Sequence, residues 1–278
     1  MVELKDKEFR ILSSFIEKQY GIRMPQSKQV MLQSRLHKRI VELGFGSFKQ
    51  YMDFLFSTEG QAAEQDHFAT IVSTHKTEFF RENNHFIALR DVLLPELLKD
   101  GLDQITVWSA ASSTGEEIYS IALTIYDFFK LRGNAYPQFK VIGTDISDNI
   151  VEFARKGIYS DKVISTIPLE YRRYIMRSKD PRKHAIRVVP EIRRYTEFFS
   201  QNLISTHYNI PCGIHIIFCR NVLIYFERQI QEEILHRLTS LLAPGGFLII
   251  GHSETLSGID LPVEQVQMTI YRKLRKIK

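Results

Sequence analysis

The sequence predicts an α/β fold, in which a doubly wound, mostly parallel sheet follows a small all-helical N-terminal domain and carries an inserted small β subdomain. Three observations predict it. Apolar residues recur at helical spacing through about the first ninety residues. Strand-like apolar runs then alternate with helical stretches, the order of a doubly wound sheet. A basic block with three prolines interrupts this alternation, so we expect domains at 1–75 and 76–278, with the insertion at about 157–195.

The N-terminal domain is expected to consist of successive helices with apolar residues three or four positions apart. Gly44 and Gly46 should end the second helix, and the third should end near residues 57–60. The apolar positions are Phe9, Leu12 and Ile16 in the first helix, Leu32, Leu36, Ile40 and Leu43 in the second, and Phe48, Tyr51 and Leu55 in the third.

The second helix also carries a basic face. Residues 24–41 include no acidic side chain, and Lys28, Arg35, Lys38 and Arg39 fall on one arc beside the apolar stripe. Such a face attracts nucleic acid, an anionic membrane or an acidic protein surface, and it is also typical of a solvated face that aids solubility.

The second domain should begin with a connecting helix at about 89–98. A turn at 244–246 should end its last helix, and residues 268–274 should form a closing edge strand. The expected strands are 105–110, 140–144, 214–219 and 247–251, and the expected helices are 116–131, 149–156 and 228–242. The insertion has an extended run at 185–189, so we expect a few short strands there.

Composition narrows the class of protein. At 278 residues, with 44% hydrophobic and 25% charged residues, the chain is typical of a soluble globular protein. It shows neither a secretory signal nor an apolar run long enough to span a membrane. Cys212 and Cys219 fit neither a disulfide scaffold nor the usual zinc spacing, so we expect a reducing cytoplasm.

The loop after the first strand is a candidate cofactor site, because it runs from Trp108 through small residues into a helix. Gly115 is its only glycine, which argues against NAD or FAD. Glu116 and Glu117 disfavour phosphate and suit a nucleoside cofactor with a positive charge. They could equally complement the helix dipole.

Asp145 closes the second strand, where such folds bind the two ribose hydroxyls. The alternative is that Asp145 caps the next helix, which Ser147 or Asp148 could do instead. Residues 219–226 pose a similar choice, since they either face a ligand or only end a strand and cap a helix.

Residues 73–82 mix hydroxyls, His, Arg and paired aromatics, which suits a cleft lining. From the residues alone, Phe79 and Phe80 belong to the core and Arg81 to a surface ion pair. His252 and Ser253 follow a strand end and are weaker catalytic candidates.

Four blocks of sequence resemble the bacterial chemotaxis receptor methyltransferases, the CheR family. They occur in the family's order, and the resemblance covers nearly the whole chain. The blocks are TEFFRE (77–82), WSAASSTGEEIY (108–119), CRNVLIYF (219–226) and GHSE (251–254). The resemblance implies a Rossmann-like fold that transfers a methyl group from S-adenosylmethionine to glutamates of chemoreceptors, the methyl-accepting chemotaxis proteins. It thereby implies a cytoplasmic enzyme of signal transduction that sets adaptation and leaves S-adenosylhomocysteine.

The resemblance also implies site residues. Arg81 and Tyr225 match the positions beside the transferring methyl group, and the implied cofactor residues are Thr77, Arg81, Glu117, Asp145, Asn202, Leu203, Arg220 and Asn221. His75 stands where the family typically has Asn, which leaves its cofactor contact with one hydrogen bond. Ile118 replaces a usual proline.

The chemistry agrees with these residues. A glutamate carboxylate is ionised at neutral pH and is itself the nucleophile, so alignment matters more than a strong base, and no metal is required. Arg35, Lys38 and Arg39 would dock an acidic receptor helix, and the insertion would pair a receptor tail by strand addition. We expect a monomer that binds no nucleic acid. The alternatives are a non-catalytic S-adenosylmethionine-binding signalling module and a methyltransferase of another substrate, such as RNA.

Overall fold

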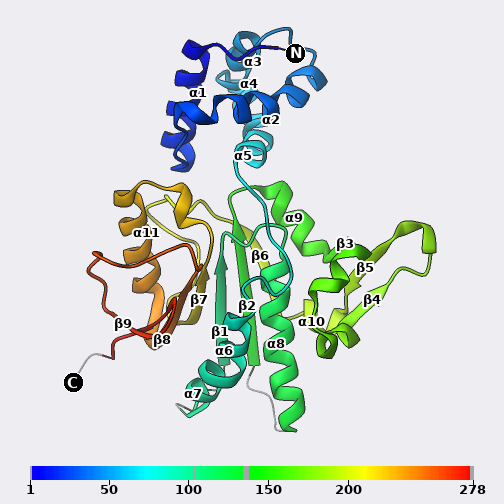
Figure 1. Ribbon diagram of the computed structural model, residues 1–278, viewed down its shortest axis with the longest axis vertical. Helices are drawn as coiled ribbons and strands as arrows, with labels where there is room; N and C mark the ends of the chain where they lie inside the picture. Colours follow the sequence, from blue (N-terminus) through cyan, green and yellow to red (C-terminus); the bar gives the residue numbers. More distant parts are fainter. Residues whose placement is uncertain (1, 100, 103, 134–137, 276–278) are drawn as a thin grey trace. The chain divides into compact units, whose positions relative to one another are not determined.

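The computed structural model describes residues 2–99, 101–102, 104–133 and 138–275. The chain divides into two compact units. One combines Met1–Thr74 with Tyr225–Gln231, and the other combines His75–Ile224 with Glu232–Lys278. The first is helical and the second contains both β-sheets (Figure 1). Within the described ranges, no helix is both long enough and apolar enough to cross a membrane.

The helical unit buries the apolar stripes that the sequence predicts. Leu12, Ile16, Leu36 and Ile40, for example, have no exposed surface. Its helices are α1 (Asp6–Tyr20), α2 (Gln29–Glu42), α3 (Phe48–Leu55), α4 (Thr58–Ala63) and α5 (Gln65–Val72). Helices α4 and α5 were not predicted, because the polar stretch before them resembles a loop. Ser57 starts α4 instead, since its Oγ accepts a hydrogen bond from the N–H of Gly60 at 3.1 Å.

The sheet unit contains a seven-stranded sheet in the order β6-β2-β1-β7-β8-β10-β9. The five strands from β6 to β8 are parallel, and β10 runs antiparallel to both of its neighbours, β8 and β9, which confirms the predicted doubly wound, mostly parallel sheet. The strand order reverses at β1, because β2, the next strand along the chain, lies on one side of β1 and β7 lies on the other side. Ligands of such sheets bind at this switch point, outside the carboxyl ends of the strands. The strands are β1 (Gln104–Ala110), β2 (Gln138–Asp145), β6 (Thr196–Ser200), β7 (Ile214–Cys219), β8 (Leu242–Ile250), β9 (Val263–Gln267) and β10 (Ile270–Lys273).

Helices and loops cover both faces of this sheet. Alternate strand residues, such as Val107 and Phe218, join the core cluster beside α8. The opposite face presents Trp108, whose ring lies 5.6 Å from that of Tyr208. The larger helices are α8 (Glu116–Arg132), α9 (Asp148–Lys156) and α11 (Arg228–Leu241), and the connecting helix consists of α6 (Asn84–Ala88), a π-helical turn (Leu89–Leu93) and α7 (Leu94–Lys99).

The insertion forms a second sheet of three short antiparallel strands, as the sequence predicts. Its order is β3-β5-β4, from β3 (Ile158–Ser160), β4 (Ile175–Arg177) and β5 (Ala185–Val188), and α10 (Pro190–Arg193) follows it. Tyr174 fastens this sheet to α8, because its hydroxyl donates to Asp127 at 2.6 Å.

Two predictions at the end of the chain are wrong in detail. The run predicted as an edge strand forms β10, which lies between β8 and β9, so β9 is the outer strand. The sequence of β9, VEQVQ, lacks the strict alternation of apolar and polar residues by which a strand is predicted. Residues 244–246 lie within β8 rather than in a turn before it, and a register irregularity opposite them, between Ile214 and Ile216, accommodates them.

Candidate functional site

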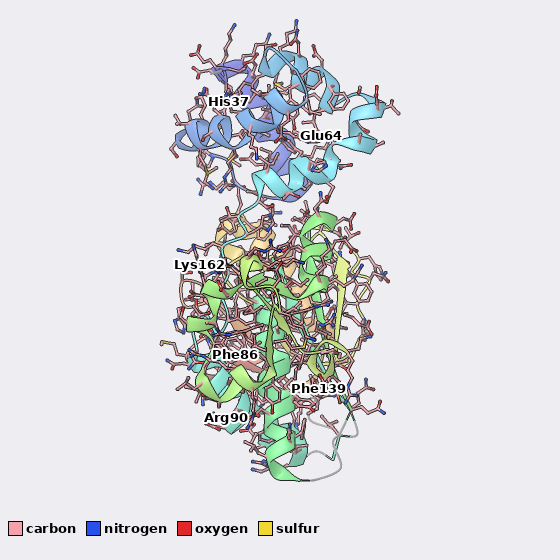
Figure 2. All side chains as sticks on the ribbon, turned by 90° about the vertical axis from the view of Figure 1, so that its right-hand side faces the viewer. His37, Glu64, Phe86, Arg90, Phe139 and Lys162 are labelled. Carbon is pink, nitrogen blue, oxygen red and sulfur yellow. The ribbon has the colours of Figure 1, made fainter. Side chains whose placement is uncertain are left out.

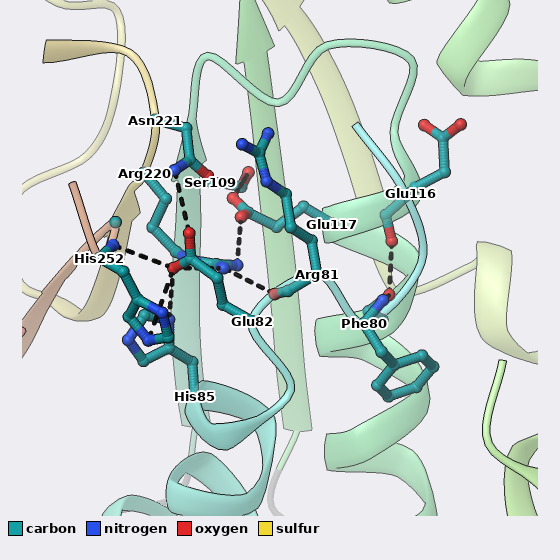
Figure 3. Close-up of polar contacts among 12 residues, drawn as sticks. Phe80, Arg81, Glu82, His85, Ser109, Glu116, Glu117, Arg220, Asn221 and His252 are labelled. Atoms are coloured by element: carbon teal, nitrogen blue, oxygen red, sulfur yellow. Dashed lines mark hydrogen bonds and ion pairs between the residues drawn. The ribbon is translucent and has the colours of Figure 1, made fainter. Parts of the chain in front are cut away.

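The candidate site lies where three strand ends and the segment 75–82 meet within the sheet unit (Figure 3). The loop after β1 is fastened to the end of β2, because the N–H of Ser112 donates to the carbonyl of Thr144 at 2.7 Å. Segment 75–82 is fastened to α8, since the N–H of Phe80 donates to Ser120 Oγ at 3.0 Å. Residues far apart in the sequence are thereby held together.

Left-handed backbone is concentrated in these loops. The structure gives seven non-glycine residues a positive φ among those it describes, and five of them belong to the candidate site. They are Phe80, Glu82, Ala111, Ser113 and Asn221. Each such conformation costs roughly 1–2 kcal/mol and persists only where the surroundings impose it. Strain of this kind is typical of ligand sites.

Asp145 lies at the end of β2 and is almost fully buried. Its carboxylate accepts hydrogen bonds from the N–H groups of Ser113 at 2.8 Å and Ile146 at 2.9 Å. Burial raises the pKa of Asp145, while the nearby His75 opposes that rise. The side chain of Ser147 caps α9, so the alternative that Asp145 is the cap is wrong.

Arg220 forms the polar centre of the site, and only 1% of its side chain is exposed. Its guanidinium lies 2.8 Å from Glu117 and 3.0 Å from Glu82, and it donates to the carbonyl of Arg81 at 2.6 Å (Figure 3). Glu117 also accepts from the hydroxyl of Ser109 at 2.7 Å. The Nε of Arg220 is buried and has no hydrogen-bond partner within the described residues.

Glu82 belongs to the candidate site, although the sequence predicts no role for it. Asn221 Nδ2 donates to its Oε1 at 3.0 Å. Burial opposes ionisation of Glu82, but the hydrogen bond from Asn221 and the charge of Arg220 outweigh it and lower the pKa to about 2. The carboxylate is therefore ionised throughout the physiological range.

Glu254 is the second residue without a predicted role, and it holds the turn after β7. Its two oxygens accept from the N–H groups of Asn221, Val222, Leu223 and Gly251 at 2.6–3.0 Å. Burial raises the pKa of Glu254, and these four donors oppose the rise. Gly251 is required here, because a Cβ would lie 2.6 Å from the Asn221 side chain.

Comparison with known proteins identifies the family. Residues 75–272 match the family described as CheR methyltransferase, SAM binding domain, and residues 7–70 match CheR methyltransferase, all-alpha domain. The chain belongs to the CheR methyltransferase family. The match to the SAM-binding domain spans all the loops of the candidate site, so S-adenosylmethionine is the cofactor class of this domain.

Named relatives agree with this assignment. The chemotaxis protein methyltransferase of Salmonella typhimurium is 38% identical, and the alignment covers 96% of this chain and 90% of the relative. That of Escherichia coli is 37% identical over 96% of this chain and 91% of the relative. Chemotaxis protein methyltransferase 2 of Pseudomonas aeruginosa is 35% identical over 90% of this chain and 87% of the relative.

Several residues implied by the CheR resemblance gather at the strand ends. His75 Nδ1 lies 4.0 Å from Asp145. The N–H of Gln201 donates to the Asp145 carbonyl at 2.8 Å, which brings Asn202 and the buried Leu203 to the end of β2. Thr77 is half-buried. Their contacts with the cofactor stay predictions.

Segment 75–82 corrects one expectation and confirms another. Phe79 and Phe80 are buried, as predicted for core residues. Arg81 forms no ion pair with a described residue. Its guanidinium instead donates to the carbonyl of Lys76 at 2.9 Å.

Tyr225 belongs to the helical unit. Its carbonyl accepts from the N–H of Arg23 at 2.8 Å, and Lys28 Nζ lies 5.9 Å from the centre of its ring. Its predicted place beside the methyl group stays a prediction.

The three predicted docking residues on α2 differ in their surroundings. Arg35 donates to three carbonyls at the end of α5, including that of Ser73 at 2.8 Å. Arg39 pairs at 2.6 Å with Glu64, a buried residue among the helices of this unit (Figure 2). Lys38 is different, because 87% of its side chain is exposed and Glu42 lies 3.7 Å away. Lys38 is therefore the most accessible of the three.

Proposed function

We propose that this CheR-family protein transfers a methyl group from S-adenosylmethionine to glutamate side chains on the cytoplasmic helices of chemoreceptors, and so sets adaptation in chemotaxis. One observation carries the proposal: the SAM-binding match at residues 75–272 includes the strand-end loops with their buried carboxylates. Carboxylates suit a cofactor that carries a positive sulfonium charge.

The proposed cofactor residues surround the ends of β1, β2 and β7. Asp145 accepts from the ribose hydroxyls, and Glu117 lines the loop after β1. His75, Thr77, Arg81, Asn202, Leu203, Arg220 and Asn221 complete the set. The buried Nε of Arg220 has no partner among the described residues and can donate to a further acceptor. S-adenosylmethionine supplies the methyl group to the receptor carboxylate.

The proposed catalytic residues are Arg81 and Tyr225. A receptor carboxylate is already ionised, so these side chains orient it and need not remove a proton. Arg81 supplies charge-assisted hydrogen bonds, and the hydroxyl of Tyr225 directs the approach.

A transfer experiment tests the function. The full chain is incubated with S-adenosylmethionine carrying a labelled methyl group, together with receptor-containing membranes and with RNA. Base-labile label on receptor protein is the expected result, because methyl esters of glutamate hydrolyse in base. Label on RNA would point to another substrate, and cofactor binding without transfer would point to a non-catalytic module.

The catalytic assignment predicts the behaviour of two variants. Arg81→Ala and Tyr225→Phe should each lower kcat by roughly a hundredfold, because loss of alignment at the reacting atoms costs about that much. Steady-state kinetics with receptor membranes measures kcat, and calorimetry of S-adenosylhomocysteine binding checks that the Tyr225→Phe cofactor site is intact. Full turnover in either variant would contradict that residue's role.

The docking assignment is best tested at Lys38. Lys38→Glu should raise the apparent KM for receptor several-fold through charge repulsion, without a change in cofactor binding. Lys49→Glu is the matched control, because Lys49 is exposed on α3 of the same unit and carries the same charge. Equal KM values for the two variants would contradict docking on α2. Arg35 and Arg39 are poorer choices, since both also hold the helical unit together.

The inserted sheet offers a second docking element. We propose that a receptor C-terminal tail adds as a strand to one of its outer strands, β3 or β4, each of which pairs only with β5 among the described strands.

A further inference from the structure

Three potential metal ligands gather beside the polar centre of the candidate site. Glu82 precedes α6, His85 lies in its first turn, and His252 follows β8 (Figure 3). One ligand atom from each side chain lies within 4.8 Å of the other two. The two imidazole rings are 5.0 Å apart at their centres.

His85 has a nitrogen whose surroundings are incomplete. The ring is 2% exposed, and its Nε2 lies 2.7 Å from the hydroxyl oxygen of Thr269. That hydroxyl lies 2.6 Å from the carbonyl of Met268, and when it donates there, its oxygen accepts from the Nε2–H tautomer of His85. In a neutral imidazole the other nitrogen, Nδ1, then carries a lone pair.

This lone pair faces another acceptor. His85 Nδ1 has no hydrogen-bond partner within the part of the chain that the structure describes, and Glu82 Oε2 lies 3.5 Å from it. Two acceptors that face each other in a buried place repel unless a proton or a metal cation lies between them, and 3.5 Å is longer than an ordinary N–H···O hydrogen bond. The orphaned nitrogen is thus an observation independent of the clustering, and it points toward Glu82 and His252.

We propose that Glu82, His85 and His252 bind a divalent transition-metal ion of the Zn²⁺ class. Ligand atoms around a tetrahedral ion lie roughly 3.3 Å apart, given bonds of about 2.0 Å. The Glu82–His85 distance of 3.5 Å nearly meets this spacing. His252 Nε2 is 3.9 Å from the same oxygen, and its side chain is 42% exposed, so it can move inward.

Neighbouring residues both orient the proposed metal ligands and limit the affinity of the site for a cation. The hydrogen bond from His85 to Thr269 fixes the ring in the way that metal-bound histidines are usually fixed. Arg220 lies 3.0 Å from the same Glu82 oxygen, and its charge opposes a second cation there. The affinity should therefore be lower than that of closed structural zinc sites, with one coordination position left to water.

Zinc alone tests the proposal, independently of methyl transfer. Zn²⁺ is titrated into the full chain in competition with a chromophoric chelator. His252→Ala should weaken the tightest site by roughly tenfold or more. His236→Ala is the matched control, because His236 Nε2 also lies 3.9 Å from a carboxylate, that of Glu232, but on the exposed surface of α11. Its zinc affinity should equal that of the wild type.

A second variant guards against loss of folding. His252→Cys keeps a ligand but replaces nitrogen with soft sulfur, so it should shift preference from Zn²⁺ toward Cd²⁺ and add a sulfur-to-metal absorption band with Co²⁺. Unfolding temperatures without metal establish that each variant is folded. Unchanged zinc affinity in His252→Ala, an equal loss in His236→Ala, or a His252→Cys protein without the Co²⁺ band would overturn the site.

Discussion

Replacing Arg220 with methionine should destabilise the sheet unit by about 3–5 kcal/mol, the usual cost of removing one partner of a buried ion pair. The side chain of Arg220 is 1% exposed, and it neutralises both Glu82 and Glu117. Without it, two largely buried carboxylates would face each other. Cofactor affinity should fall as well, because the loops after β1 and β7 lose their shared anchor.

Urea unfolding followed by fluorescence of Trp108 measures the stability effect. This is the only tryptophan of the chain, and it lies in β1, so its signal reports on the sheet unit. Arg90→Met is the control, because Arg90 pairs with the exposed Asp91 and should cost less than about 1 kcal/mol. Similar losses in the two variants would mean that the buried pairs contribute little.

Replacing Arg39 with methionine should destabilise the helical unit by a comparable amount, about 3–5 kcal/mol. Glu64 is 1% exposed and accepts from Arg39 through both oxygens, while the hydroxyl of Tyr51 donates to it at 3.1 Å. Loss of the guanidinium leaves the buried carboxylate with one neutral donor. Hydrogen exchange of the amides in α2 and α5 measures the effect within this unit, which contains no tryptophan.

A double variant separates the charge from the packing. Arg39→Met combined with Glu64→Gln should recover part of the loss, because the uncompensated charge is gone. If the double variant is as unstable as the sum of the two single variants, packing of the Arg39 stem rather than the ion pair stabilises the unit.

The sequence was sufficient to predict the sheet, because its central strands are long apolar runs whose periodicity differs from that of the helices. Short or polar elements escaped prediction. Helix α4 has six residues and depends on the cap from Ser57, and β9 exists because β10 pairs with it. Pairing partners outside a segment decide such elements, and periodicity within the segment does not reveal them.

The location of a site residue was predictable where the residue directly follows a predicted strand, while its role toward the cofactor stays a prediction. Asp145 and the residues after β7 are examples. Glu82 and Glu254 were missed because most of their partners are remote in the sequence: Glu82 accepts from Asn221, 139 positions away, and three of the four donors to Glu254 belong to the turn after β7. Only the folded chain brings such groups together.

The basic residues of α2 show a second limit of prediction from sequence, because a helical projection does not reveal which side chains already have partners in the fold. A helical projection placed Arg35 and Arg39 on a common face with Lys38. It could not reveal that Arg35 caps the end of α5 or that Arg39 neutralises a buried glutamate. A count of charges on a helix face therefore overestimates what is available to a partner.

The helical unit is built from two separate stretches of chain, since Tyr225–Gln231 joins the first 74 residues. During synthesis the ribosome releases those first residues early, yet the N–H of Arg23 receives its acceptor only when the carbonyl of Tyr225 emerges. Domains usually complete their folding in the order of synthesis. Here the unit that is synthesised first is completed only after residues 75–224 of the second unit have been made, so a nascent chain stalled before residue 225 would hold an unfinished helical unit.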